Sequence, residues 1–116
     1  METVEFLKVK FEEYVAQHTA ALLEGSGKKA NRIHKKIGKV YEQLDNLGRV
    51  DVLKDYLNES DEYLKSWAAA LLLKRYPQLS ESVFVALSQS SNFFISSEAK
   101  FFLQICKNKE WDKLVF

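Results

Sequence analysis

Cysteine, proline and glycine are all scarce in this chain of 116 residues, which has one Cys, one Pro and four Gly. The single cysteine, Cys106, cannot form an internal disulfide and fits a reducing compartment, where we expect it to be a small buried residue of a helix. Few helix-breaking residues among many helix formers favour an all-α fold. A chain of this length is expected to fold as one domain.

Long apolar runs are also missing. Crossing a bilayer takes about 20 consecutive apolar residues, and no run in this chain approaches that length. We therefore expect no membrane partner. The N-terminal stretch mixes Glu2, Glu5, Glu12 and Glu13 with apolar residues, unlike the basic and apolar regions of a signal peptide. This pattern predicts a cytoplasmic protein. The formal net charge of +1 implies by itself neither a nucleic-acid nor a membrane partner.

The sequence contains no recognisable catalytic or metal-binding motif. No serine lies in a nucleophile elbow, and no Gly-rich phosphate loop occurs. Neither His18 nor His34 has a Cys, Asp or Glu at metal-ligand spacing. The adjacent acids of residues 12–13 and 61–62 point to different faces of a helix, so they make poor acid/base pairs. We therefore expect no enzyme activity, no cofactor and no metal.

Apolar residues recur at steps of three and four positions, which predicts six to seven helices. The central one lies between Ser60 and Pro77, where Trp67 to Leu73 is apolar on all sides and must be covered by neighbours. Ser60 or Asp61 would cap it, and Pro77 would end it. The other expected helices span residues 4–24, 28–47 (closed by a left-handed Gly48) and 50–57, followed by one capped by Ser80 and one opened by Ser96 or Ser97.

A shift of 35 residues lays Asp61 on Ser96 and Trp67 on Phe102, which indicates a weak internal repeat. The period is near that of small α-solenoid repeats, whose helical hairpins stack and bury a shared core. We predict a single compact domain of antiparallel hairpins stacked as short HEAT-like repeats. Residues 1–48 would form an N-terminal hairpin, residues 49–107 two HEAT-like hairpins, and residues 108–116 a tail. Chance matching of apolar patterns is the alternative to a true repeat.

Two stretches resemble a bacterial family of small all-α proteins. The first is Ala20 to Gly25 followed by Lys28 to Lys36, and the second is Tyr63 to Leu72, which looks like the HEAT-type helix of that family. The family is catalogued as a domain of unknown function, and some members resemble immunity proteins of contact-dependent growth-inhibition or other polymorphic toxin systems. The resemblance implies a binding protein with no known reaction. Our first hypothesis is a non-enzymatic immunity protein that binds and neutralises a toxin domain, with a nuclease as the expected class; a nucleic-acid-binding or regulatory module that uses the basic helix of residues 28–47 is the alternative. Lys65 departs from the family, which often carries Arg there.

The acidic residues gather in one segment, because residues 42–62 carry seven acids against two basic residues. Four of these acids flank the turn before the central helix, where a helical-repeat protein commonly presents contact residues. They are our first candidates for partner binding: Asp55, Glu59, Asp61 and Glu62. Carboxylates there would occupy the basic active site of a nuclease and speed association. Helix capping and solubility are the alternative roles.

The basic residues gather just before, since residues 28–39 carry six Lys or Arg and no acid. The second candidate surface is the basic face of this predicted helix: Lys28, Arg32, Lys35, Lys36 and Lys39. A solvated face is its simplest interpretation, and docking of an acidic protein or of a nucleic acid are the alternatives. We expect nucleic acid to be the weaker of the two, because the adjacent acidic segment repels phosphates. A scaffold or oligomer with Trp111 and Phe116 in a self-interface is a further possibility.

Overall fold

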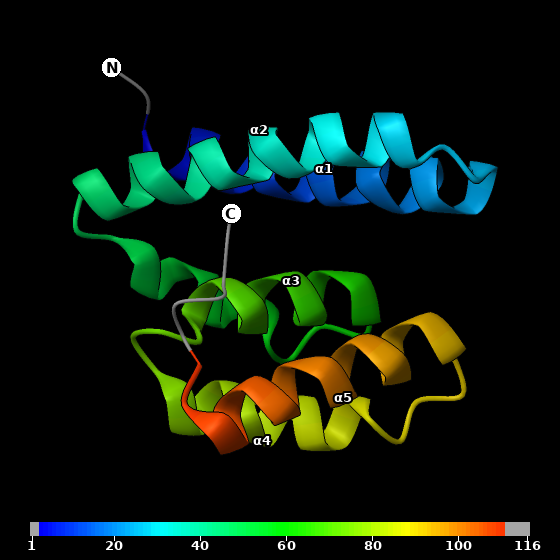
Figure 1. Cartoon of the computed structure of the whole chain (residues 1–116). Helices are drawn as coiled ribbons and strands as arrows, with labels where there is room; N and C mark the ends of the chain where they lie inside the picture. Colours follow the sequence, from blue (N-terminus) through cyan, green and yellow to red (C-terminus); the bar gives the residue numbers. More distant parts are fainter. Residues whose placement is uncertain (1–2, 111–116) are drawn as a thin grey trace. The chain divides into compact units, whose positions relative to one another are not determined.

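The computed structural model describes residues 3–110. Within this range the chain forms five α-helices and one 3-10 helix and no strand, which confirms the predicted all-helical fold (Figure 1). The helices are α1 (Val4–Glu24), α2 (Gly27–Asn46), η1 (Val50–Tyr56), α3 (Glu62–Leu72), α4 (Pro77–Leu87) and α5 (Phe93–Asn108). The internal contacts divide the chain into two units, with the boundary between Val52 and Leu53. No helix in the described part of the chain is long and apolar enough to cross a membrane.

The first unit is built on the antiparallel hairpin of α1 and α2, which lie side by side along their length (Figure 1). Thr3 caps α1, because its Oγ1 accepts a hydrogen bond from the Phe6 amide at 3.1 Å. Apolar residues at helical spacing face the interior of the hairpin. The buried members are Leu7, Phe11, Val15 and Ala21 of α1, and Ala30, Ile37, Val40 and Leu44 of α2.

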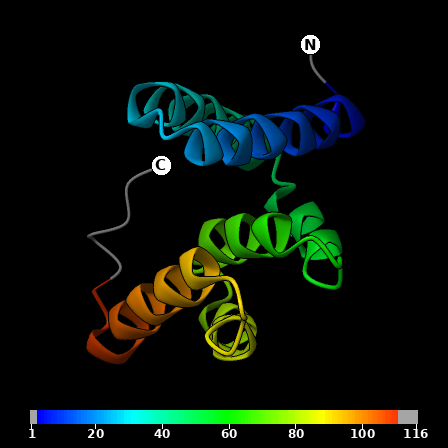
Figure 2. The ribbon, with the colours of Figure 1, turned by 90° about the vertical axis from the view of Figure 1, so that its right-hand side faces the viewer.

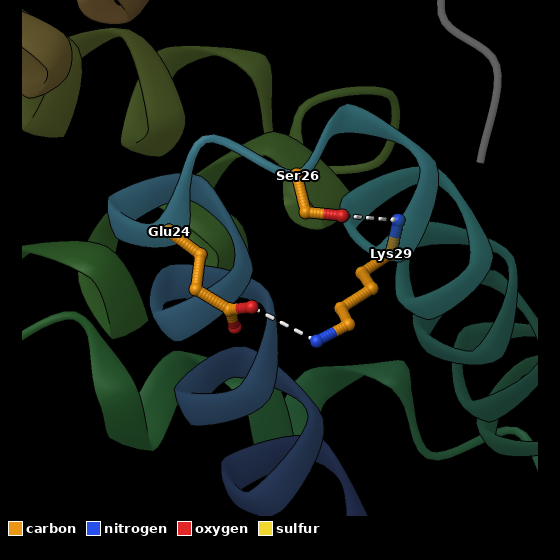
Figure 3. Close-up of polar contacts among 3 residues, drawn as sticks. All are labelled: Glu24, Ser26 and Lys29. Carbon is orange, nitrogen blue, oxygen red and sulfur yellow. Dashed lines mark hydrogen bonds and ion pairs between the residues drawn. The ribbon is translucent and has the colours of Figure 1, made fainter.

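The hairpin turn is fixed by local chemistry at both helix ends. Gly25 ends α1 with a φ of 79°, a left-handed conformation that glycine adopts without a steric penalty. Ser26 then caps α2, because its hydroxyl accepts a hydrogen bond from the Lys29 amide at 3.3 Å. The Lys29 ammonium also lies 2.9 Å from the Glu24 carboxylate (Figure 3). The pair is exposed, so it adds little stability.

The end of α2 follows the sequence prediction. Gly48 has a φ of 67°, as expected for a residue that closes a helix in the left-handed region. The segment after it forms the predicted short helix, but as a 3-10 helix, η1. Its apolar side chains are buried, among them Val50, Leu53 and Tyr56.

The second unit centres on α3, which packs against both α4 and α5, and α4 also packs against α5. Figure 2 looks nearly along the axis of α4, with α3 and α5 beside it. Every residue from Trp67 to Leu73 is buried. The prediction that this apolar run is covered on all sides is therefore confirmed. The Lys54 ammonium of η1 lies 3.8 Å from the centre of the Tyr76 ring, so a cation–π contact links η1 to the turn before α4.

Two expected helix boundaries in this unit were wrong. Asp61 does cap α3, accepting hydrogen bonds from the Tyr63 and Leu64 amides at 2.9 and 3.3 Å. However, α3 ends at Leu72, and Pro77 is the first residue of α4 rather than the end of α3. The fixed φ of proline suits the first helical position, where its missing amide proton is not needed. Ser80 is therefore not a cap but a fully buried residue inside α4.

The start of α5 also differs from the prediction. Asn92 caps it, accepting from the Phe94 and Ile95 amides at 3.0 and 3.3 Å, so the helix begins a full turn before Ser96. Asparagine caps as well as serine, and composition could not rank the two. The shift that lays Asp61 on Ser96 consequently does not align the starts of α3 and α5. Trp111 and Phe116 lie outside the described residues.

Candidate functional site

Three large apolar side chains are exposed on one face of α5. Phe93 is 82% exposed, Phe94 49% and Phe101 58%. Positions separated by seven or eight residues fall on the same side of a helix, so these rings form one surface. With Ser97 and Glu98 they line an apolar groove of about 340 Å³. We call Phe93, Phe94 and Phe101 the phenylalanine surface.

The phenylalanine surface is anchored to the core by aromatic contacts. The Phe101 ring meets the Phe102 ring edge to face, with 5.4 Å between centroids and an interplanar angle of 71°. Phe102 in turn stacks on Phe84 of α4 at 4.8 Å and 14°. Phe84 is fully buried. Offset and edge-to-face pairs are favourable geometries, so the exposed ring of Phe101 rests on a rigid support.

Hydrogen bonds from α3 hold the loop that leads into this surface. The Ser90 hydroxyl donates to the Glu62 carboxylate at 2.8 Å. The Asn92 side-chain amide donates to the Tyr63 hydroxyl at 3.0 Å. Asn92 at the same time caps α5, so one residue fixes both the start of the helix and its contact with α3. These bonds fix the position of Phe93, the first residue of α5.

A third hydrogen bond reaches a residue that lines the groove. The buried hydroxyl of Ser66 on α3 donates to the Glu98 carboxylate at 3.3 Å. Glu98 is itself a lining residue of the groove. The Glu98 carboxylate is therefore held in a lining that is mostly apolar.

The four predicted acidic residues do not form one cluster of equivalent groups. The Asp61 carboxylate caps α3, and the Glu62 carboxylate accepts a hydrogen bond from the Ser90 hydroxyl. Asp55 lies on η1 and Glu59 in the turn after it, and both are exposed. The capping role that the sequence left open for Asp61 is confirmed. Partner binding by these acids stays a prediction.

The predicted basic face is present on α2, where Lys28, Arg32, Lys35, Lys36 and Lys39 are all exposed. Two of its members also border a groove of about 200 Å³ between α1 and α2, which we call the α1–α2 groove. The lining residues are Phe6, Leu7, Lys10 and Tyr14 of α1, and Lys36, Lys39, Val40 and Gln43 of α2. Sequence patterns could not predict this groove, because it depends on the register between the two helices.

The pKa values of His18 and Cys106 are shifted by their surroundings. Burial, and then the charge of His34, lower the pKa of His18; the two rings are 6.5 Å apart between centroids. Burial, followed by the negative charge of Glu81, raises the pKa of the Cys106 thiol. A raised pKa disfavours the thiolate, the reactive form. Cys106 is buried on α5, as the sequence predicted.

A metal centre is not formed by the described residues, among which no group of three or more His, Cys, Asp or Glu side chains gathers. The phenylalanine surface was missed by sequence reasoning, which assigned no role to Phe93, Phe94 or Phe101. A helix start at Asn92 would have revealed it, since that start places all three rings on one face, away from buried Ile95 and Ala99.

Comparison of the chain with protein-family models, with curated proteins and with solved structures found no match.

Proposed function

We propose that this protein is a non-enzymatic module that binds a protein partner through the phenylalanine surface. The observation that carries the proposal is the exposure of three phenylalanine rings on one anchored face of α5. Contiguous exposed apolar patches mark interaction sites, and aromatic side chains dominate the binding energy of interfaces. Burying the exposed four fifths of Phe93 would contribute about 1.2–2.5 kcal/mol.

The acids near this surface, Glu98 and Glu62, suit a partner with basic residues, although Lys100, seven positions after Phe93, is an exposed cation on the same side of α5. Glu98 lines the groove, and Glu62 is bonded to Ser90 just before Phe93. Asp61 and Glu59 precede Glu62 and are exposed. An apolar centre with Glu98 in its lining and Glu62 beside the loop before it complements an apolar segment flanked by Lys or Arg, and such charge complementarity speeds association. A nuclease domain must attract phosphates, so the surface around its active site carries positive charge.

The partner that we propose is therefore a bacterial toxin domain, most simply a nuclease, which this protein neutralises in the cytoplasm as an immunity protein. The resemblance of Tyr63 to Leu72 to a family that includes immunity-like proteins supports this identity. We also propose that the second unit is a short HEAT-like stack, because α3, α4 and α5 all pack against one another. In such a stack α3 is the covered centre, and α5 presents the partner surface.

The proposal predicts that a neighbouring gene encodes a toxin domain, and the test is complex formation between that domain and the full chain. Both proteins are purified, mixed and analysed by size-exclusion chromatography with light scattering, which also reports self-association of the chain alone. We expect a complex with a fixed stoichiometry and loss of toxin activity within it. A mixture that elutes as two separate proteins, with the toxin still active, would refute the proposal.

The acidic edge is tested separately by association kinetics at low and high salt. Glu59→Lys should slow association and reduce its salt dependence, since charge acts mainly on the on-rate. Asp61→Asn removes a charge but keeps a capping side chain, so it should slow association without unfolding α3. Lys74→Glu, at an exposed position on the turn after α3, provides a control for a general change of charge. Unchanged kinetics for both acidic variants would exclude this edge from the interface.

A further inference from the structure

We propose that the α1–α2 groove binds single-stranded nucleic acid, with phosphates on its lysines and one base against its aromatic side chains. This groove is built from other helices than the phenylalanine surface. Its ligand is therefore independent of the protein partner proposed above.

The groove has the charge that phosphates require. Lys10, Lys36 and Lys39 line it, and none of the described residues that line it is an acid. The Lys10 ammonium is 3.3 Å from the Glu13 carboxylate, an exposed pair that a phosphate can displace at little cost. Beyond the groove the cations continue along α2 to Lys28, over roughly 16 Å at the rise of an α-helix. A backbone of several phosphates can follow this row.

The groove also has the aromatic surface that unpaired bases require. The Lys36 ammonium lies 5.7 Å from the Tyr14 ring centroid, and the Lys10 ammonium lies 5.5 Å from that of Phe6. Each pair offers a cation and a ring within reach of one nucleotide. Because exposed lysines are flexible and exposed cation–π contacts are weak, the ammonium can turn to a phosphate and free the ring face. A positive groove with aromatic side chains is the arrangement that binds single strands.

The size and lining of the groove favour this ligand over two others. Its volume of about 200 Å³ accepts one base or side chain of a longer ligand rather than a complete small molecule. An acidic peptide would use the lysines but has no general need of the Tyr14 and Phe6 rings. A duplex keeps its bases stacked inside, where these rings cannot reach them. The acidic segment of residues 42–62, which made nucleic acid the weaker expectation, contributes none of its acids to the lining; its lining residue is the neutral Gln43.

The test measures fluorescence anisotropy of a labelled oligothymidylate with the full chain, at about 50 mM and about 200 mM salt. Three phosphate contacts predict a slope of log K against log salt of about −2, since each contact contributes about −0.7 on a single strand. Lys36→Gln and Lys39→Gln should each make the slope shallower by about 0.7. Lys100→Gln, an exposed cation of α5 outside the groove, is the matched control and should change nothing.

The aromatic contribution is tested at Tyr14. Tyr14→Leu should weaken binding about 5-fold or more at an unchanged salt slope, whereas Tyr14→Phe should bind like the natural chain, because the ring is what stacks. Circular dichroism of each variant confirms that α1 and α2 are intact. Four results would overturn the proposal: no binding, equal binding of a duplex, binding of polyglutamate in preference to the oligonucleotide, or equal weakening by Lys100→Gln.

Discussion

Removing Phe93 should leave the fold almost unchanged, although it deletes a large apolar side chain. The ring is 82% exposed, so only about a fifth of the roughly 1.5–3 kcal/mol for burying a phenylalanine is realised in the free protein. Phe93→Ser should therefore lower the free energy of unfolding by about 0.3–0.6 kcal/mol. Serine and phenylalanine have similar helix propensities, so the backbone adds little to this cost.

Phe84 provides the contrast, because it is fully buried and stacks on Phe102 at 4.8 Å. Phe84→Ala should lower the free energy of unfolding by about 3–5 kcal/mol, the usual cost of a large-to-small change in a core. Urea unfolding followed by circular dichroism measures both variants. A loss above about 2 kcal/mol for Phe93→Ser would mean that this ring is covered, and the phenylalanine surface would then not exist as described.

Three further predictions concern groups inside the two units. Ser80→Ala should raise the free energy of unfolding by about 1 kcal/mol in a urea titration, because the buried Ser80 hydroxyl has no hydrogen-bond partner among the described residues. A lower free energy of unfolding for this variant would contradict the prediction. Burial and His34 lower the pKa of His18 below its ordinary value of 6.5, so the unfolded chain binds the proton more tightly than the folded chain. The free energy of unfolding should therefore fall as the pH drops below about 6.5 through the lowered pKa, and His18→Gln should flatten that part of the profile of melting temperature against pH. Cys106 should react with iodoacetamide far more slowly than in the urea-unfolded chain, since it is buried with a raised thiol pKa, and equal rates would show that the α5 core opens readily.

Much of the fold could be predicted from the sequence, because burial leaves a direct pattern. The run from Trp67 to Leu73 has no polar face, and only a covered helix can satisfy it. Gly25 and Gly48 marked helix ends, because the left-handed conformation at both positions favours glycine. Helix starts were less predictable: Asn92 and Ser96 are both good caps, and only the packing of α5 on α3 selects between them.

The candidate sites were harder to predict, for physical reasons that differ between them. Exposing Phe93 runs against the tendency of apolar residues to be buried, so a pattern-based assignment favours the core for it. The α1–α2 groove depends on which residues of the two helices face each other, and the apolar periodicity of each helix does not determine that register. The acidic residues were visible in the sequence, but their hydrogen bonds, such as that of Glu62 with Ser90, were not.

The most direct test of the phenylalanine surface is the dissociation constant of the proposed partner, a toxin domain, measured by calorimetry for three proteins. These are the natural chain, Phe93→Ser, and Leu23→Ser as a control at a position that is 79% exposed on α1. Loss of about 1.2–2.5 kcal/mol of binding free energy in Phe93→Ser predicts a dissociation constant that is higher by about 8- to 70-fold. The dissociation constant of Leu23→Ser should equal that of the natural chain. Equal dissociation constants for all three proteins would show that the partner does not bind there.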